Sequence, residues 1–203
     1  MADGARDRTR ADDGTTPIDE DESEGLLPTH LISRAELNQW EARNITRALR
    51  WVALRTPRVL DVRFLQNLHR RMFDETWAWA GTFRRSDKSI SPFHWTEVPR
   101  LLHDLVADMR ERHAQCDGSA IVLDTLAARF HHELVRIHPW PNGNGRHARL
   151  ATDLLLRNWR RPPFTWGALD SAVDRVETRA RYLTALRAAD AGSLDSLLQF
   201  VRT

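Results

Sequence analysis

The segment from Ile137 to Arg149, IHPWPNGNGRHAR, constrains the fold of this chain more than any other stretch. A helix is expected before it, and Pro139 ends that helix because proline cannot continue the backbone hydrogen-bond pattern. Glycines then permit a tight loop before a second helix, expected from Gly145 to Trp159. The segment therefore predicts two helices joined by a short loop, with His138 at the end of the first. The apolar stripe of that first helix consists of Leu123, Leu126, Phe130, Leu134 and Ile137.

The loop combines residue types that handle phosphate groups. Backbone N–H groups of glycines before a helix can approach an anion closely, and the helix N-terminus adds partial positive charge. Arg146 and Arg149, three residues apart, would share one face of the second helix and offer guanidinium groups to phosphate oxygens. His138 titrates near neutrality and can take a proton from a hydroxyl group. Together these residues predict a site for a nucleotide phosphate chain.

The same residues resemble the motif of the Fic family (filamentation induced by cAMP), which runs His-x-Phe-x-Asp/Glu-Gly-Asn-Gly/Lys-Arg-x-x-Gly/Arg. His138 stands at the general-base position, and Trp140 replaces the phenylalanine that anchors the loop in the core. Arg146 and Arg149 match the first and second phosphate-binding arginines. The nucleotide-binding residues that the resemblance implies are Asn142, Gly143, Asn144, Gly145, Arg146 and Arg149.

Asn142 departs from the family motif. It occupies the place of the carboxylate that, in the family, holds Mg²⁺ against the nucleotide phosphates. An asparagine carbonyl can still coordinate a hard cation, but it contributes no negative charge. The resemblance thus implies ATP as a substrate and Mg²⁺ as a cofactor, with Asn142 as a weak metal ligand.

The resemblance extends from about Leu31 to the end of the chain. Trp79-Ala80-Gly81 looks like the family's Trp-Ala-Gly segment. We therefore expect a Fic domain over residues 31–203, preceded by a disordered or docked arm over residues 1–30. The sequence from Pro141 to Arg149 is similar to that of the subgroup called mobile mystery protein B. This resemblance implies a helix-turn-helix companion protein as a partner.

The rest of the chain predicts an all-α fold with one small β-hairpin. Ser33 and Glu36 form a capping-box pattern, and further helices are expected over residues 61–73, 97–113, 169–189 and 193–201. Two short segments around Ser86-Asp87 suggest a hairpin over residues 82–94. In the family this flap lies beside the site and pairs with an extended target segment, which implies Lys88, Ser89 and Ile90 as target-binding residues. A hairpin without a partner is the alternative.

Glu24-Gly25 matches part of an inhibitory helix found in many Fic proteins, Ser/Thr-x-x-x-Glu-Gly/Asn. Its glutamate pairs with the second motif arginine, which here is Arg149. The Ser/Thr position of that pattern is occupied by Glu20, so only the Glu-Gly pair matches. Glu24 is thus a candidate inhibitory residue, and an acidic segment that is simply solvated is the alternative.

Charge and length limit the class of partner. The 30 basic residues nearly balance the 28 acidic ones, so no direct nucleic-acid binding is expected. No apolar run approaches the ~20 residues that span a bilayer, and because the N-terminus lacks a basic region followed by an apolar stretch, no secretory signal is expected. The single cysteine, Cys116, cannot form an internal disulfide, which fits the reducing cytoplasm.

The resemblance implies a protein adenylyltransferase, which moves AMP from ATP to a hydroxyl side chain of a target protein. His138 would act as the general base. Two alternatives remain open. One is other phosphoryl or nucleotidyl transfer on the same site; the other is a non-catalytic module that binds a nucleotide or a partner, which Asn142 favours.

Overall fold

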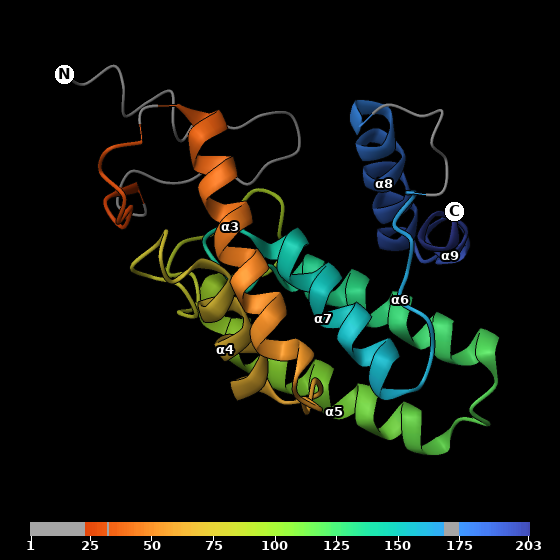
Figure 1. Cartoon of the computed structure of the whole chain (residues 1–203). Coiled ribbons are helices and arrows are strands. Elements are labelled where there is room, and N and C mark those ends of the chain that lie inside the picture. The colour runs from red at the N-terminus through yellow and green to blue at the C-terminus, as the bar shows by residue number, and fades with distance from the viewer. Residues whose placement is uncertain (1–22, 32, 169–174) are drawn as a thin grey trace.

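The computed structural model describes residues 23–31, 33–168 and 175–203. Within these ranges the chain is all-α, which confirms the expected fold class (Figure 1). None of these helices combines the length and the apolar character that crossing a bilayer requires. The helices are α3 (Arg34–Ala53), α4 (Val62–Phe73), the short 3-10 helix η1 (Trp95–Glu97), α5 (Val98–Gln115), α6 (Ala120–Ile137), α7 (Asn144–Asn158), α8 (Arg175–Asp190) and α9 (Asp195–Arg202).

Local sequence signals explain where several helices begin. The capping box of α3 is confirmed: the Glu36 N–H donates to Ser33 Oγ at 3.2 Å, and the Ser33 N–H donates to the Glu36 carboxylate at 3.1 Å. Asp61 caps α4 by accepting from the Phe64 N–H at 2.9 Å. Ser119 occupies the N-cap position of α6, but its side chain makes no capping bond. The start of the helix expected over residues 169–189 lies outside the described residues.

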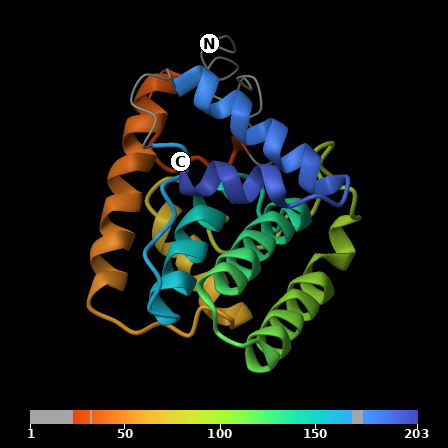
Figure 2. The same ribbon diagram turned by 90° about the vertical axis from the view of Figure 1, so that its right-hand side faces the viewer.

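Helices α6 and α7 form the centre of the domain. They run antiparallel and are joined by the loop of residues 138–143 (Figures 1 and 2). Their apolar side chains contribute to two cores, one shared with α3, α4 and α5, the other shared with α8 and α9. The motif loop therefore lies at one end of a helix pair that is covered from both sides.

The expected β-hairpin over residues 82–94 is wrong, because this described segment contains no paired strands. The buried Arg84 side chain donates instead to the carbonyls of Ser86 (2.9 Å), Phe93 (2.8 Å) and His138 (2.9 Å). Such side-chain bonds satisfy backbone acceptors that a hairpin ladder would otherwise pair. The segment therefore closes as a loop around one guanidinium group, and this group also ties it to the motif.

The described part of the N-terminal arm is docked on the segment after α4. Leu26 forms an isolated antiparallel bridge with Trp77, and the Leu27 N–H donates to the Thr76 carbonyl at 2.9 Å. These bonds hold residues 25–27 against the chain that follows α4. Residues 1–22 of the expected arm lie outside the described residues.

Replacing Arg84 tests whether one side chain organises the loop. Arg84→Gln should destabilise the protein by roughly 2–4 kcal/mol, because several buried carbonyls lose their donor. Hydrogen exchange of the amides of residues 85–93 should accelerate as well. Arg85→Gln is the matched control, since Arg85 is exposed; it should change stability by no more than about 0.5 kcal/mol. Equal stability of both variants would contradict this account.

Candidate active site

His138 is presented to the site by the end of α6. It is the C-cap residue, in a left-handed conformation (φ 54°, ψ 61°), and is only 4% exposed. Its Nδ1 lies 3.3 Å from the Val135 carbonyl. Because a carbonyl can only accept, Nδ1 carries the proton, and Nε2 is the basic nitrogen of the neutral ring. The fold thus supplies a histidine with a defined tautomer.

The surroundings of His138 keep it neutral. Burial, together with the nearby cations Arg84 and Lys88, lowers the pKa of His138 to about 3. A neutral imidazole can accept a proton, whereas an imidazolium cannot. A bound phosphate would oppose the two cations and raise the pKa of His138 as a proton arrives.

Trp140 anchors the motif loop in the core, as the sequence predicts. It is fully buried and stacks on His69 and Phe83, with ring centroids 4.5 and 5.2 Å away. Asn144 holds the Trp140 backbone through two bonds, N–H to Oδ1 at 2.9 Å and Nδ2 to the carbonyl at 2.8 Å. The Asn144 side chain, expected to bind the nucleotide, is thus used within the loop.

His69 is a site residue that the sequence analysis missed. Its Nδ1 accepts from the Gly81 N–H at 3.0 Å, so Nε2 carries the proton and donates to the Asn142 carbonyl at 3.0 Å. Burial, followed by the neighbouring His147, places the pKa of His69 well below its usual value. This neutral ring connects the Trp-Ala-Gly segment to the motif loop. On the sequence it reads only as one more residue of α4.

The two motif glycines serve different purposes. Gly143 has a left-handed φ of 79°, and a Cβ there would lie 2.5 Å from the Phe73 ring. Glycine is therefore required by both conformation and space. A Cβ at Gly145 would meet nothing within 4 Å. Gly145 instead lines a cavity, where the missing side chain leaves room for a ligand.

That cavity lies between the loop of residues 89–92, the end of α6 and one face of α8. Its volume is about 620 Å³, within the usual range for small-molecule sites. His138 and Gly145 line it on the motif side, and Tyr182 and Asp190 line it on the α8 side. His132 Nε2 lies 2.8 Å from Asp190 and links α6 to α8. The cavity thus brings the expected base and part of the expected anion loop to one place.

The predicted arginines contact opposite sides of the domain. The Arg149 guanidinium lies over the Tyr182 ring, 4.5 Å from its centroid. Its Nε is buried and has no hydrogen-bond partner among the described residues. Arg146 lies over Phe73 and donates to the Glu41 carboxylate at 2.6 Å. The sequence analysis did not anticipate Glu41.

Asn142 does not present a free oxygen. Its Oδ1 accepts a hydrogen bond from the Gly143 N–H, whereas its buried Nδ2 has no partner among the described residues. No group of three or more acidic, histidine or cysteine residues that could hold a metal ion occurs in the described part of the chain. The loop therefore does not fit an Mg²⁺ ion held by Asn142, because the side-chain oxygen is engaged and the atom left without a partner is a donor.

The three residues predicted to bind a target, Lys88, Ser89 and Ile90, differ in their exposure. The Lys88 side chain is buried at 4% exposure and lies close enough to affect the pKa of His138. Ser89 and Ile90 are exposed and line the cavity. The role of these residues in target binding stays a prediction. Because Lys88 is buried, it would act by lowering the pKa of His138 and not by contacting the target.

Glu24 is exposed, and within the described ranges it forms no ion pair with Arg149. The arm that carries Glu24 docks beside Trp77, whereas Arg149 lies against α8. An inhibitory role of Glu24 therefore stays a prediction.

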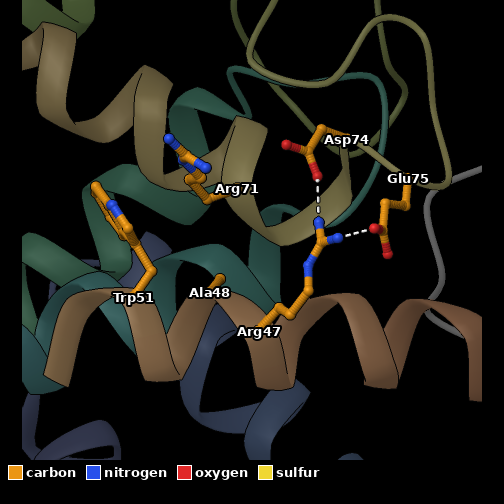
Figure 3. A pocket seen from close by; sticks show the side chains of 6 residues that line it. All are labelled: Arg47, Ala48, Trp51, Arg71, Asp74 and Glu75. Atoms are coloured by element: carbon orange, nitrogen blue, oxygen red, sulfur yellow. Dashed lines mark hydrogen bonds and ion pairs between the residues drawn. The ribbon is translucent and has the colours of Figure 1, made fainter.

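A second hollow lies between α3 and α4 (Figure 3). No motif residue lines it. Arg47 pairs there with Asp74 at 3.0 Å and with Glu75, and Arg71 lies over the Trp51 ring. Because its cations are already engaged, we do not take it as the functional site.

These features define an all-α domain in which a glycine-containing loop joins two antiparallel helices beside a cavity. The Fic/DOC family model matches residues 59–156. The resemblance to the Fic family, expected from the motif, is thus confirmed over these residues. The mobile mystery protein B subgroup stays a prediction.

Curated relatives are named as adenylyltransferases. The chain is 36% identical over 125 residues to "Protein adenylyltransferase fic-1" of Caenorhabditis briggsae, covering 60% of this chain and 22% of that protein. It is 27% identical over 135 residues to "Protein adenylyltransferase Fic" of Nematostella vectensis, covering 66% and 30%. The chain thus spans less than a third of the length of either relative.

Solved structures share the fold. Fic-1 from C. elegans superposes with a TM-score of 0.61 at 26% identity, covering 89% of this chain and 51% of that chain. BepC from Bartonella tribocorum, which has bound AMPPNP, superposes with a TM-score of 0.70 at 17% identity, covering 91% and 97%. At this identity the BepC likeness concerns the fold alone.

The contrast between the two glycines is testable. Gly145→Ala should keep or raise thermal stability, because alanine favours the helix by up to about 1 kcal/mol. It should nevertheless weaken ligand binding, since the methyl group enters the cavity. Gly143→Ala should instead lower the melting temperature through strain and the clash with Phe73. Unchanged nucleotide affinity of a folded Gly145→Ala variant, measured by calorimetry, would refute the assignment of this cavity.

Buried neutral histidines predict that the domain loses stability in acid. Burial lowers the pKa to about 3 for His131 and His138 and to about 4 for His147. Because the unfolded chain binds these protons near pH 6.5, the free energy of unfolding should fall as pH drops below 6.5, by up to about 1.4 kcal/mol per pH unit for each group. His132 acts oppositely: burial lowers its pKa, but Glu133 and Asp190 outweigh this and raise it. Thermal melts from pH 7 to pH 4 should show a falling melting temperature, and a flat profile would contradict this.

Proposed function

We propose that this chain is a protein adenylyltransferase that moves AMP from ATP to a hydroxyl side chain of a target protein. The observation that carries the proposal is that the motif contains two buried donors without partners in the described part of the chain and also contributes His138 and Gly145 to a cavity. Arg149 Nε and Asn142 Nδ2 are buried without hydrogen-bond partners among the described residues, and both belong to the motif whose Gly145 lines the cavity. A phosphate chain would satisfy such donors, because it offers negatively charged acceptors. The adenylyltransferase names of the relatives and the AMPPNP bound in BepC support ATP as the donor.

The chain's own groups suggest how transfer would proceed. The nucleoside would occupy the cavity between the loop of residues 89–92 and α8, with the phosphates at the start of α7. His138 Nε2 would take the proton of the target hydroxyl while its oxygen forms a bond to the α-phosphorus. The bond from that phosphorus to the bridging oxygen breaks, and pyrophosphate leaves. The backbone N–H groups of the motif and the two arginines would stabilise the charge on the phosphate oxygens.

The cation expected with ATP has no evident protein ligand in this loop. In the family, Mg²⁺ neutralises phosphate charge, but the Asn142 side-chain oxygen accepts from the Gly143 N–H, and its amide nitrogen is a buried donor without a partner among the described residues. We propose that Asn142 contacts the phosphates directly through Nδ2. The proposed proton transfer to His138 and the proposed contacts of the arginines and backbone N–H groups with the phosphates do not depend on a metal held by Asn142.

The rival function is a non-catalytic module that binds nucleotide without transfer. The lack of a carboxylate at Asn142 favours it, since metal-assisted charge neutralisation is a large part of phosphate transfer. Asn142→Asp separates the two functions. If the wild-type protein binds ATP but transfers nothing, and the aspartate variant transfers AMP, the natural chain is a binding module.

Two protein partners are proposed for this chain. A target protein would approach past Ser89 and Ile90, and a helix-turn-helix companion is proposed from the subgroup resemblance. We also propose the cytoplasm as the compartment, since the chain has a single, free cysteine.

Removing the base tests the proposed activity. His138→Ala should lower AMP transfer to target proteins in a lysate by roughly 10²–10⁴-fold while ATP still binds. The matched control is His103→Ala, an exposed histidine of α5 outside the cavity, which should transfer at the wild-type rate. Equal transfer by wild type and His138→Ala would refute the role of His138.

A further inference from the structure

Glu41 is a buried carboxylate in the middle of α3. It is 1% exposed and lies outside residues 59–156, the part of the chain matched by the family model. Its two oxygens have different partners. Trp77 Nε1 donates to Oε1 at 2.8 Å, and the Arg146 guanidinium donates to Oε2 at 2.6 Å. A residue of α3 is thus bonded directly to the first arginine of the motif.

The ion pair between Glu41 and Arg146 is difficult to break because of its surroundings. A buried carboxylate that loses its cationic partner is an uncompensated charge, which is strongly unfavourable. The Trp77 bond prevents Glu41 from following Arg146 if the arginine moves. The Phe73 ring, 5.0 Å from the guanidinium, restricts Arg146 further. The Arg146 side chain is therefore held in one place on the surface of α7.

Arg146 nevertheless remains accessible to a ligand. Its side chain is 36% exposed, whereas that of Glu41 is 1% exposed. A guanidinium has five N–H donors, and the bond to Glu41 uses one of them. A phosphate oxygen could therefore bind the exposed edge of Arg146 without displacing Glu41.

We propose that Glu41 is a positioning residue, which acts through Arg146 to fix one guanidinium for the phosphate chain of the nucleotide. This inference rests on the proposed function, because it takes ATP as the ligand. Trp77 extends the connection, since its backbone bridges Leu26 of the docked arm. The described part of the arm is thus connected to the motif through Trp77, Glu41 and Arg146.

Calorimetric titration of the full chain with ATP and with adenosine tests the proposal. Glu41→Gln keeps the size of the side chain and an acceptor for Trp77 but removes the charge that holds Arg146. ATP affinity should fall by roughly tenfold to a hundredfold, as expected for a misplaced binding group, while adenosine affinity stays unchanged. Asp74→Asn is the matched control. It also removes a carboxylate that pairs with an arginine between α3 and its neighbour, here Arg47, but it does not touch the motif, so it should leave ATP affinity unchanged.

A double variant shows whether Glu41 acts through Arg146. If it does, Glu41→Gln combined with Arg146→Gln should bind ATP no more weakly than Arg146→Gln alone. Independent, additive losses would overturn the proposal, as would equal losses for adenosine and ATP, which indicate a general structural role. Unchanged or tighter ATP binding by Glu41→Gln would overturn it as well.

Two further results complete the test. Trp77→Phe leaves the ion pair in place and should cause a smaller loss with the same preference for ATP over adenosine. A loss that is equal for both ligands would count against the proposal. If the wild-type protein binds adenosine but not ATP, the proposed function fails at its donor and this inference fails with it. Wild-type ATP binding with no effect of Glu41→Gln overturns the inference alone.

Discussion

The buried guanidinium of Arg84 determines how the site is assembled. It donates to the His138 carbonyl at the end of α6 and to the carbonyls of Ser86 and Phe93 in the loop over the cavity. One side chain thus holds the cavity wall and the base in register. The same charge helps to keep His138 neutral, because it lowers the pKa of that ring. The position of His138, the proposed base, and its neutral state therefore both depend on Arg84.

Around this junction the domain places polar groups of two kinds. Some are satisfied internally and give the loop its shape, such as Asn144 on the Trp140 backbone and His69 on the Asn142 carbonyl. Others, Asn142 Nδ2 and Arg149 Nε, are buried donors without partners among the described residues. Because unpaired buried donors are unfavourable, a site that keeps them is suited to an anionic ligand. This division separates the groups that shape the motif loop from those that we propose contact the nucleotide.

Short-range sequence patterns were sufficient to predict much of the fold and part of the candidate site. The helix–loop–helix at residues 137–149, the capping box at Ser33 and the core role of Trp140 all follow from local rules, and the structure agrees. The prediction of a hairpin was wrong because the Arg84 side chain donates to the backbone carbonyls of this segment. Strand propensity takes no account of such side-chain bonds. Glu41 was missed because its partners lie far along the chain. A signal did exist, since Glu41 occupies the buried face of α3 together with Leu37, Asn44 and Ala48, where an unpaired carboxylate would be unfavourable.

The central claim is that this site transfers the α-phosphate of ATP with its nucleoside. The most direct measurement compares incubation of the protein and a cell lysate with ATP labelled at the α-phosphate and with ATP labelled at the γ-phosphate, under otherwise identical conditions. The account predicts that label enters protein from the α position and not from the γ position. Label entering from the γ position would establish phosphoryl transfer instead. No protein label from either position, in a preparation shown to bind ATP, would contradict catalysis and leave a nucleotide-binding module.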